Sequence, residues 1–94
     1  MPRIEELGDG FIIVEGLRAC GKTITALLHN VRTKPLREYD IFLSWVIEQA
    51  EAAITGEEDG SETHDLADPY GYPLSIRRKW DESDLQVNII AEAV

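Results

Sequence analysis

One stretch of the chain has the residue types and the spacing needed to bind phosphate. Gly16-Leu17-Arg18-Ala19-Cys20-Gly21-Lys22-Thr23 matches the pattern G-x-x-x-x-G-K-[ST]. In such a loop, Gly16 and Gly21 let backbone N–H groups curl around phosphate oxygens. Lys22 reaches the terminal phosphates, and the Thr23 hydroxyl binds magnesium. The pattern therefore predicts a binding site for Mg-ATP or Mg-GTP made of these four residues.

The segment around this pattern resembles the start of P-loop ATPases and nucleotide kinases. An apolar run, Phe11 to Val14, precedes it, and apolar residues follow it at the spacing of a helix. The resemblance covers residues 11–31. It implies a strand, a Walker A loop and a helix, with the family's roles falling on Gly16, Gly21, Lys22 and Thr23. The remainder of the chain departs from the family, because ninety-four residues leave room for about four strands and one or two helices.

The same residues allow a second interpretation, in which the segment is a β-hairpin. Thr23-Ile24-Thr25 favours a strand, and Ile24, Ala26 and Leu28 alternate with other residues. Ala19-Cys20-Gly21-Lys22 is then the turn, with Gly21 supplying a positive φ. Because the chain is short for a P-loop domain, we take the hairpin as the first prediction and the nucleotide site as the alternative.

Acidic groups are concentrated in one quarter of the chain. Asp and Glu number 18 against 9 Lys and Arg, and residues 47–70 hold eight of the acidic groups and no basic one. Within this quarter, residues 56–71 are predicted to form an acidic loop. Its carboxylates suit the docking of a basic partner or, as a third function, the mimicry of nucleic-acid charge. The candidate partner-binding residues are Glu57, Glu58, Asp59, Glu62, Asp65 and Asp68.

Other reactive residue types lack the neighbours that catalysis or metal binding requires. His64 lies near two carboxylates but has no second His or Cys close in sequence, and His29 is expected at the surface or a helix end. Cys20 is the single cysteine, so no internal disulfide can form, and no nearby His activates it. We therefore predict no catalytic residue, no metal site and no cofactor outside the nucleotide alternative.

The remaining elements are predicted from hydrophobic periodicity. Residues 35–54 form the clearest helix, with Gly56 as its stop. Residues 74–91 alternate as a hairpin that turns at 81–84. Trp45 and Trp80 are expected in the core between them. Arg77-Arg78-Lys79 forms a small basic strip beside Trp80.

These elements predict one α+β domain, residues 1–94, with a small antiparallel sheet of two hairpins and one main helix packed on it, in a ββαββ order. Such a sheet has open edges and a half-covered surface, which favours a protein partner or self-association. We therefore expect a non-enzymatic interaction protein, such as an assembly subunit, adaptor or inhibitor of the kind common in phage and mobile elements. The acidic balance argues against direct binding to nucleic acid or to an anionic membrane.

No apolar stretch approaches the roughly 20 residues of a spanning helix, and the N-terminus has no apolar region typical of a secretion signal. We therefore expect a soluble, intracellular protein, in the cytoplasm or within an assembled particle.

Overall fold

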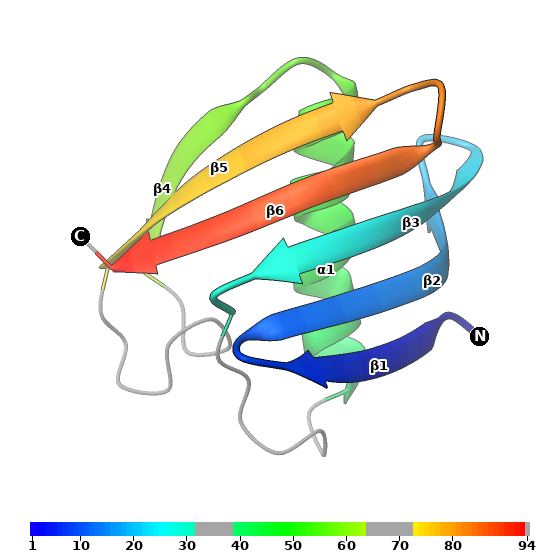
Figure 1. Cartoon of the computed structure of the whole chain (residues 1–94). Helices are drawn as coiled ribbons and strands as arrows, with labels where there is room; N and C mark the ends of the chain where they lie inside the picture. Colours follow the sequence, from blue (N-terminus) through cyan, green and yellow to red (C-terminus); the bar gives the residue numbers. More distant parts are fainter. Residues whose placement is uncertain (32–38, 64–72, 94) are drawn as a thin grey trace.

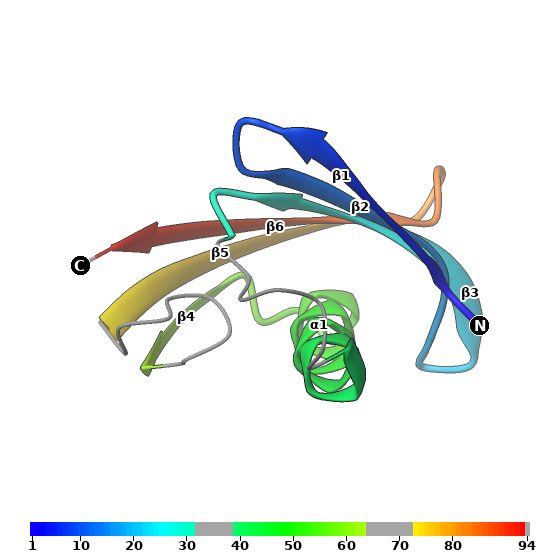
Figure 2. The same ribbon diagram turned by 90° about the horizontal axis from the view of Figure 1, so that it is seen from below.

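A computed structural model describes residues 1–31, 39–63 and 73–93. Six strands form one sheet, and a single described helix, α1 (Tyr39–Ile54), crosses one side of it (Figures 1 and 2). The strands are β1 (Arg3–Gly8), β2 (Phe11–Ala19), β3 (Lys22–His29), β4 (Asp59–Thr63), β5 (Pro73–Asp81) and β6 (Gln86–Ala93). They lie in the order β1-β2-β3-β6-β5-β4.

The sheet is mixed, so the prediction of an antiparallel ββαββ sheet is wrong. β3 and β6 pair in parallel at its centre, and every other neighbouring pair is antiparallel. Two edge strands were also missed. Half of the residues of β1 are charged, and β4, with the sequence Asp-Gly-Ser-Glu-Thr inside the predicted acidic loop, has no apolar side chain. Charged and polar edge strands of this kind resist pairing with other chains, which is why they lack a strand-like hydrophobic pattern.

The predicted hairpin at residues 19–22 is confirmed. Ala19 pairs with Lys22, and the two residues between them, Cys20 and Gly21, have φ values of 50° and 75°. Positive φ at both central positions is the geometry of a type I′ turn, whose twist matches that of paired strands. The turn therefore continues β2 directly into β3.

Gly16, the first glycine of the phosphate-binding pattern, forms a bulge within β2. The pairing with β3 shifts between Glu15 and Leu17, and Gly16 has a φ of 77°. The extra residue changes which positions face the helix: Ile12 and Val14 are buried before the bulge, and Leu17 and Ala19 after it. A strict period of two therefore fails across this strand.

The helix ends where the sequence predicts. Gly56, with φ 99°, donates its backbone N–H to the carbonyl of Ala53, and Glu57 donates to the carbonyl of Ala52 at 2.8 Å. This pair of bonds satisfies two terminal carbonyls, as in a Schellman motif. The predicted start at Pro35 lies outside the described residues.

The core lies between α1 and the side of the sheet that it covers. Trp45 is 2% exposed, and Trp80 packs against the same cluster from β5, which confirms both tryptophans as core residues. The strands β2, β3, β5 and β6 contribute buried residues from this side of the sheet, including Val14, Leu28, Ile76 and Ile89. No described helix is long and apolar enough to cross a membrane.

Candidate protein-binding face

The residues of the phosphate-binding pattern lie in the β2–β3 hairpin. Gly16 is in the bulge, Gly21 is in the turn, and Lys22 and Thr23 are the first residues of β3. Arg18 donates a hydrogen bond from Nη1 to the Thr23 Oγ1 at 2.7 Å, and from Nη2 to the Gly21 carbonyl at 3.4 Å. Residues 22–29 are therefore a strand, where a Walker A loop is followed by a helix.

Lys22 and Thr23 also point to opposite sides of the sheet. Consecutive strand residues alternate, and Lys22 shares the side of buried Ile24, whereas Thr23 shares the side of Arg18. The predicted chemistry needs the ammonium group and the hydroxyl at the same nucleotide phosphates. The nucleotide-binding interpretation thus stays a prediction from sequence, with no counterpart in the geometry of the hairpin.

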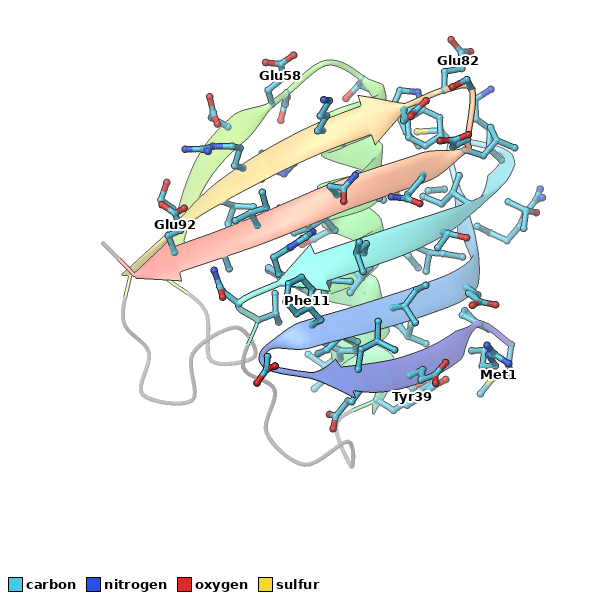
Figure 3. The ribbon with its side chains drawn as sticks, in the orientation of Figure 1. Met1, Phe11, Tyr39, Glu58, Glu82 and Glu92 are labelled. Carbon is cyan, nitrogen blue, oxygen red and sulfur yellow. The ribbon has the colours of Figure 1, made fainter. Side chains whose placement is uncertain are left out.

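Part of the predicted acidic surface can be located. Glu57, Glu58 and Asp59 are exposed where the chain leaves α1 and enters β4 (Glu58 is labelled in Figure 3). Glu62 lies in β4, where its backbone pairs with Leu74 of β5. The other candidates, Asp65 and Asp68, lie outside the described residues, as does His64. The acidic docking surface stays a prediction.

The predicted basic strip is divided between the two sides of the sheet. Arg78 is buried beneath β4, where its Nε donates to the Gln49 Oε1 at 2.8 Å and its Nη1 donates to the Glu57 carbonyl at 3.4 Å. A Cβ at Gly60 would lie 2.8 Å from the Arg78 guanidinium, so the glycine makes room for it. Arg77 and Lys79 face the opposite side and are exposed.

That opposite side, which we call the open face, is covered by no described element (Figure 2). It nevertheless carries apolar side chains on three adjacent strands. The half-buried or exposed residues are Phe11, Ile13, Leu27 and Ile90. Phe11 is 39% exposed and projects from this face in Figure 3. A contiguous apolar patch rimmed by polar groups is typical of an interaction surface.

The signal for this patch is visible in the sequence. A half-solvated strand alternates apolar and polar residues, so an apolar doublet places one apolar side chain on each side of the sheet. Phe11-Ile12-Ile13-Val14, Leu27-Leu28 and Ile89-Ile90 are such doublets on β2, β3 and β6. One member of each faces α1, and the other faces outward.

The strand pairing aligns the open face into rows that run across the sheet. The first row is Gly8, Phe11, His29, Ile90 and Arg77; the second is Glu5, Ile13, Leu27, Asn88 and Lys79; the third is Arg3, Glu15, Thr25, Gln86 and Asp81. Each row has apolar or uncharged residues on the three central strands, apart from Glu15. Charged groups stand mainly at the two flanks, on β1 and β5.

Polar contacts fix several side chains of this face. The His29 ring lies edge-on to Phe11, with centroids 4.9 Å apart, and its Nε2 is 3.3 Å from the Asn88 Oδ1. The Arg3 Nη2 lies 3.2 Å from Glu15 and 3.5 Å from Glu5. These contacts hold the rim and one side of the patch in defined positions, which lowers the entropy cost of binding.

The open face is also nearly balanced in charge. Its cations on the described strands are Arg3, Arg18, Arg77 and Lys79, and its carboxylates are Glu5, Glu15, Asp59, Asp81 and Glu92. The large negative excess of the chain therefore lies elsewhere, chiefly in residues 47–70. Two such faces can approach each other without strong net repulsion.

Other candidate chemistry does not gather into a site among the described residues. No group of three His, Cys, Asp or Glu there could hold a metal ion. Cys20 is exposed, with its sulfur 3.9 Å from a Glu51 carboxylate oxygen near the end of α1.

In comparisons with known proteins, no protein-family model matches this chain, and no curated protein or solved structure matches it either. The function is therefore argued from the geometry of the chain itself.

Proposed function

We propose that this chain is a non-enzymatic protein that works by binding a protein surface to the open face of its sheet. One observation supports this most directly: Phe11, Ile13, Leu27 and Ile90 stand together on a face that no described element covers. The covered side already supplies a complete core around Trp45. The outward apolar residues therefore expose apolar surface to water without adding to that core. Burial of this surface against a bound protein would be favourable.

The proposal extends to the setting of the protein. A soluble protein in a reducing, intracellular compartment agrees with a chain that has one cysteine, exposed as a free thiol. The flat apolar centre with charged flanks suits a folded protein partner better than a nucleic acid, because the face has no excess of cations. The acidic residues Glu57 and Glu58 lie outside this face, and their docking role stays a separate prediction.

Site-specific photocrosslinking tests the proposal. A benzophenone amino acid in place of Phe11, in the full chain produced in its native cells, should yield a covalent adduct with a protein. The same group in place of Ile41, which is 58% exposed on α1, serves as the matched control and should give none. Mass spectrometry then identifies the adduct. No protein adduct from Phe11, and none from Ile90, would overturn the proposal.

A further inference from the structure

The order of residues along the rows of the open face suits packing against the same face of a second copy of the chain. When a row is reversed about its position on β3 and laid against itself, each residue meets a defined residue of the second copy. In the second row, Leu27 meets Leu27 of the second copy, and Glu5 meets Lys79. In the third row, Arg3 meets Asp81. Opposite charges thus face each other at both flanks.

The apolar residues show the same complementarity. In the first row, reversal about β3 places Phe11 against Ile90 of the second copy and His29 against His29. The remaining central contacts set Ile13 against the uncharged Asn88, and the Glu15 carboxylate against the Gln86 amide. No pair of like charges is formed in the three rows.

We propose, building on the protein-binding function above, that the partner of the open face is a second copy of this chain. The two sheets pack face to face around a two-fold axis that runs along β3. Such an axis keeps each row opposite the same row of the other copy and reverses its order, which is the isologous arrangement of a symmetric dimer. Packed sheets with nearly aligned strands are a common way to bury two apolar faces.

Neighbouring positions of the axis are less favourable. An axis along β6 would place Leu27 against Lys79 and His29 against Arg77, so two cations would cover apolar or aromatic groups. An axis between β3 and β6 would place Phe11 against Arg77 and Ile13 against Lys79. Of these three positions, the axis along β3 is the one that buries apolar groups at the centre and sets opposite charges against each other at the flanks of the second and third rows.

Three of the four flanking side chains have the length that this geometry needs. Twisted sheets diverge away from the centre of their contact, so the outer pairs must be bridged by long side chains. Arg3, Glu5 and Lys79 are long and exposed, whereas Asp81 is short and its carboxylate also accepts hydrogen bonds from Ser83 and Asp84, so the length of Arg3 must span that pair. Each pair occurs twice in a symmetric dimer, so reversing one charge changes two contacts at once.

Sedimentation equilibrium of the full chain tests the proposal. The wild type should be a dimer, and Leu27→Glu, which sets two carboxylates against each other on the axis, should be a monomer. Ile41→Glu, on the exposed side of α1, is the matched control and should remain a dimer. Circular dichroism should show the same fold in each variant. A wild type that stays monomeric at millimolar concentration, or a Leu27→Glu variant that remains dimeric, would overturn the proposal.

Charge-reversal variants test whether the two-fold axis of the dimer runs along β3. Glu5→Lys and Lys79→Glu should each weaken the dimer about tenfold, because two rim pairs become repulsive, and the double variant should restore it. A double variant as weak as the single ones would contradict the β3 axis.

If the chain is monomeric while the benzophenone at Phe11 captures a different protein, the self-association fails and the protein-binding function stands. If Phe11 captures nothing, both fail.

Discussion

The two sides of the sheet take apolar side chains from the same strands but place them in different surroundings. Leu28 faces α1 and is 0% exposed, whereas Leu27, its neighbour on β3, faces outward and is half-buried. Arg78 and Arg77 differ in the same way on β5. The comparison shows that residue type alone does not define a core here. What separates the two sides is whether another element of the chain covers them.

The largest expected difference between the two sides is in core packing. Leu28→Ala should lower the free energy of unfolding by about 2–5 kcal/mol, because it opens a cavity beneath α1. Leu27→Ala should cost the single chain about 1 kcal/mol or less, because water already reaches that side chain. Urea denaturation, at concentrations where the chain is monomeric, measures both. Equal losses would show that the open face is covered within one chain.

Neighbouring arginines give the next largest contrast. Arg78→Ala should lower the free energy of unfolding by about 2–3 kcal/mol, because it leaves the buried Gln49 oxygen and the Glu57 carbonyl without this donor. Arg77→Ala should change it by about 0.5 kcal/mol or less, since the side chain is exposed. Thermal unfolding followed by circular dichroism compares the two variants. If Arg77→Ala proves the more damaging of the two, the assignment of sides on β5 is wrong.

A smaller effect is expected from Asp81, at the flank of the open face. The Ser83 hydroxyl, the Asp84 backbone N–H and the Ser83 backbone N–H donate to its carboxylate and hold the pKa of Asp81 below its usual value of 3.8. A pKa lower in the folded than in the unfolded state stabilises the fold above pH 3.8 and loses that stabilisation as pH falls through the folded pKa.

Asp81→Asn should therefore remove a small part of the acid sensitivity below about pH 4, measured as the melting temperature against pH. Glu82→Gln, at the exposed tip of the same turn, is the control and should leave that profile unchanged. An acid profile that is the same for Asp81→Asn and the wild type would show that these hydrogen bonds do not form in solution.

The smallest expected effect concerns nucleotide. Because Lys22 and Thr23 point to opposite sides of β3, Mg-ATP and Mg-GTP at millimolar concentration should leave the melting temperature unchanged. A rise that Lys22→Ala abolishes would contradict this expectation and restore the nucleotide-binding interpretation. Thr25→Ala, in the same strand, would then serve as the control.

Sequence patterns that act locally predicted their elements correctly. The alternation in residues 74–91, the glycine at position 56 and the Cys20-Gly21 turn each depend on a few neighbouring residues. The parallel pairing of β3 with β6 joins residues about sixty positions apart, and no local pattern records it. The bulge at Gly16 shifts the alternation of β2, so a strict period of two does not follow this strand to Ala19.

The candidate site was predicted only in outline. The small number of predicted elements indicates a half-covered sheet that could bind a partner. The residues predicted to bind that partner, however, were the acidic ones of 57–68. A continuous apolar run such as Phe11 to Val14 is typical of a strand buried on both sides, so the run alone does not show which of its residues face outward. Only the position of α1, on one side of the sheet, separates Ile13 from Ile12.

The parallel pair at the centre of the sheet has a consequence for the way the protein is made. β1, β2 and β3 can pair with one another as soon as they leave the ribosome, but β3 then has an unpaired edge until β6 follows. Contacts between segments so distant in sequence form slowly. During synthesis, the backbone N–H and C=O groups along this edge of β3 stay open to other chains until residues 86–93 have emerged. A ribosome that stalls before residue 86 would therefore hold a chain with an exposed strand edge, which a chaperone would have to protect.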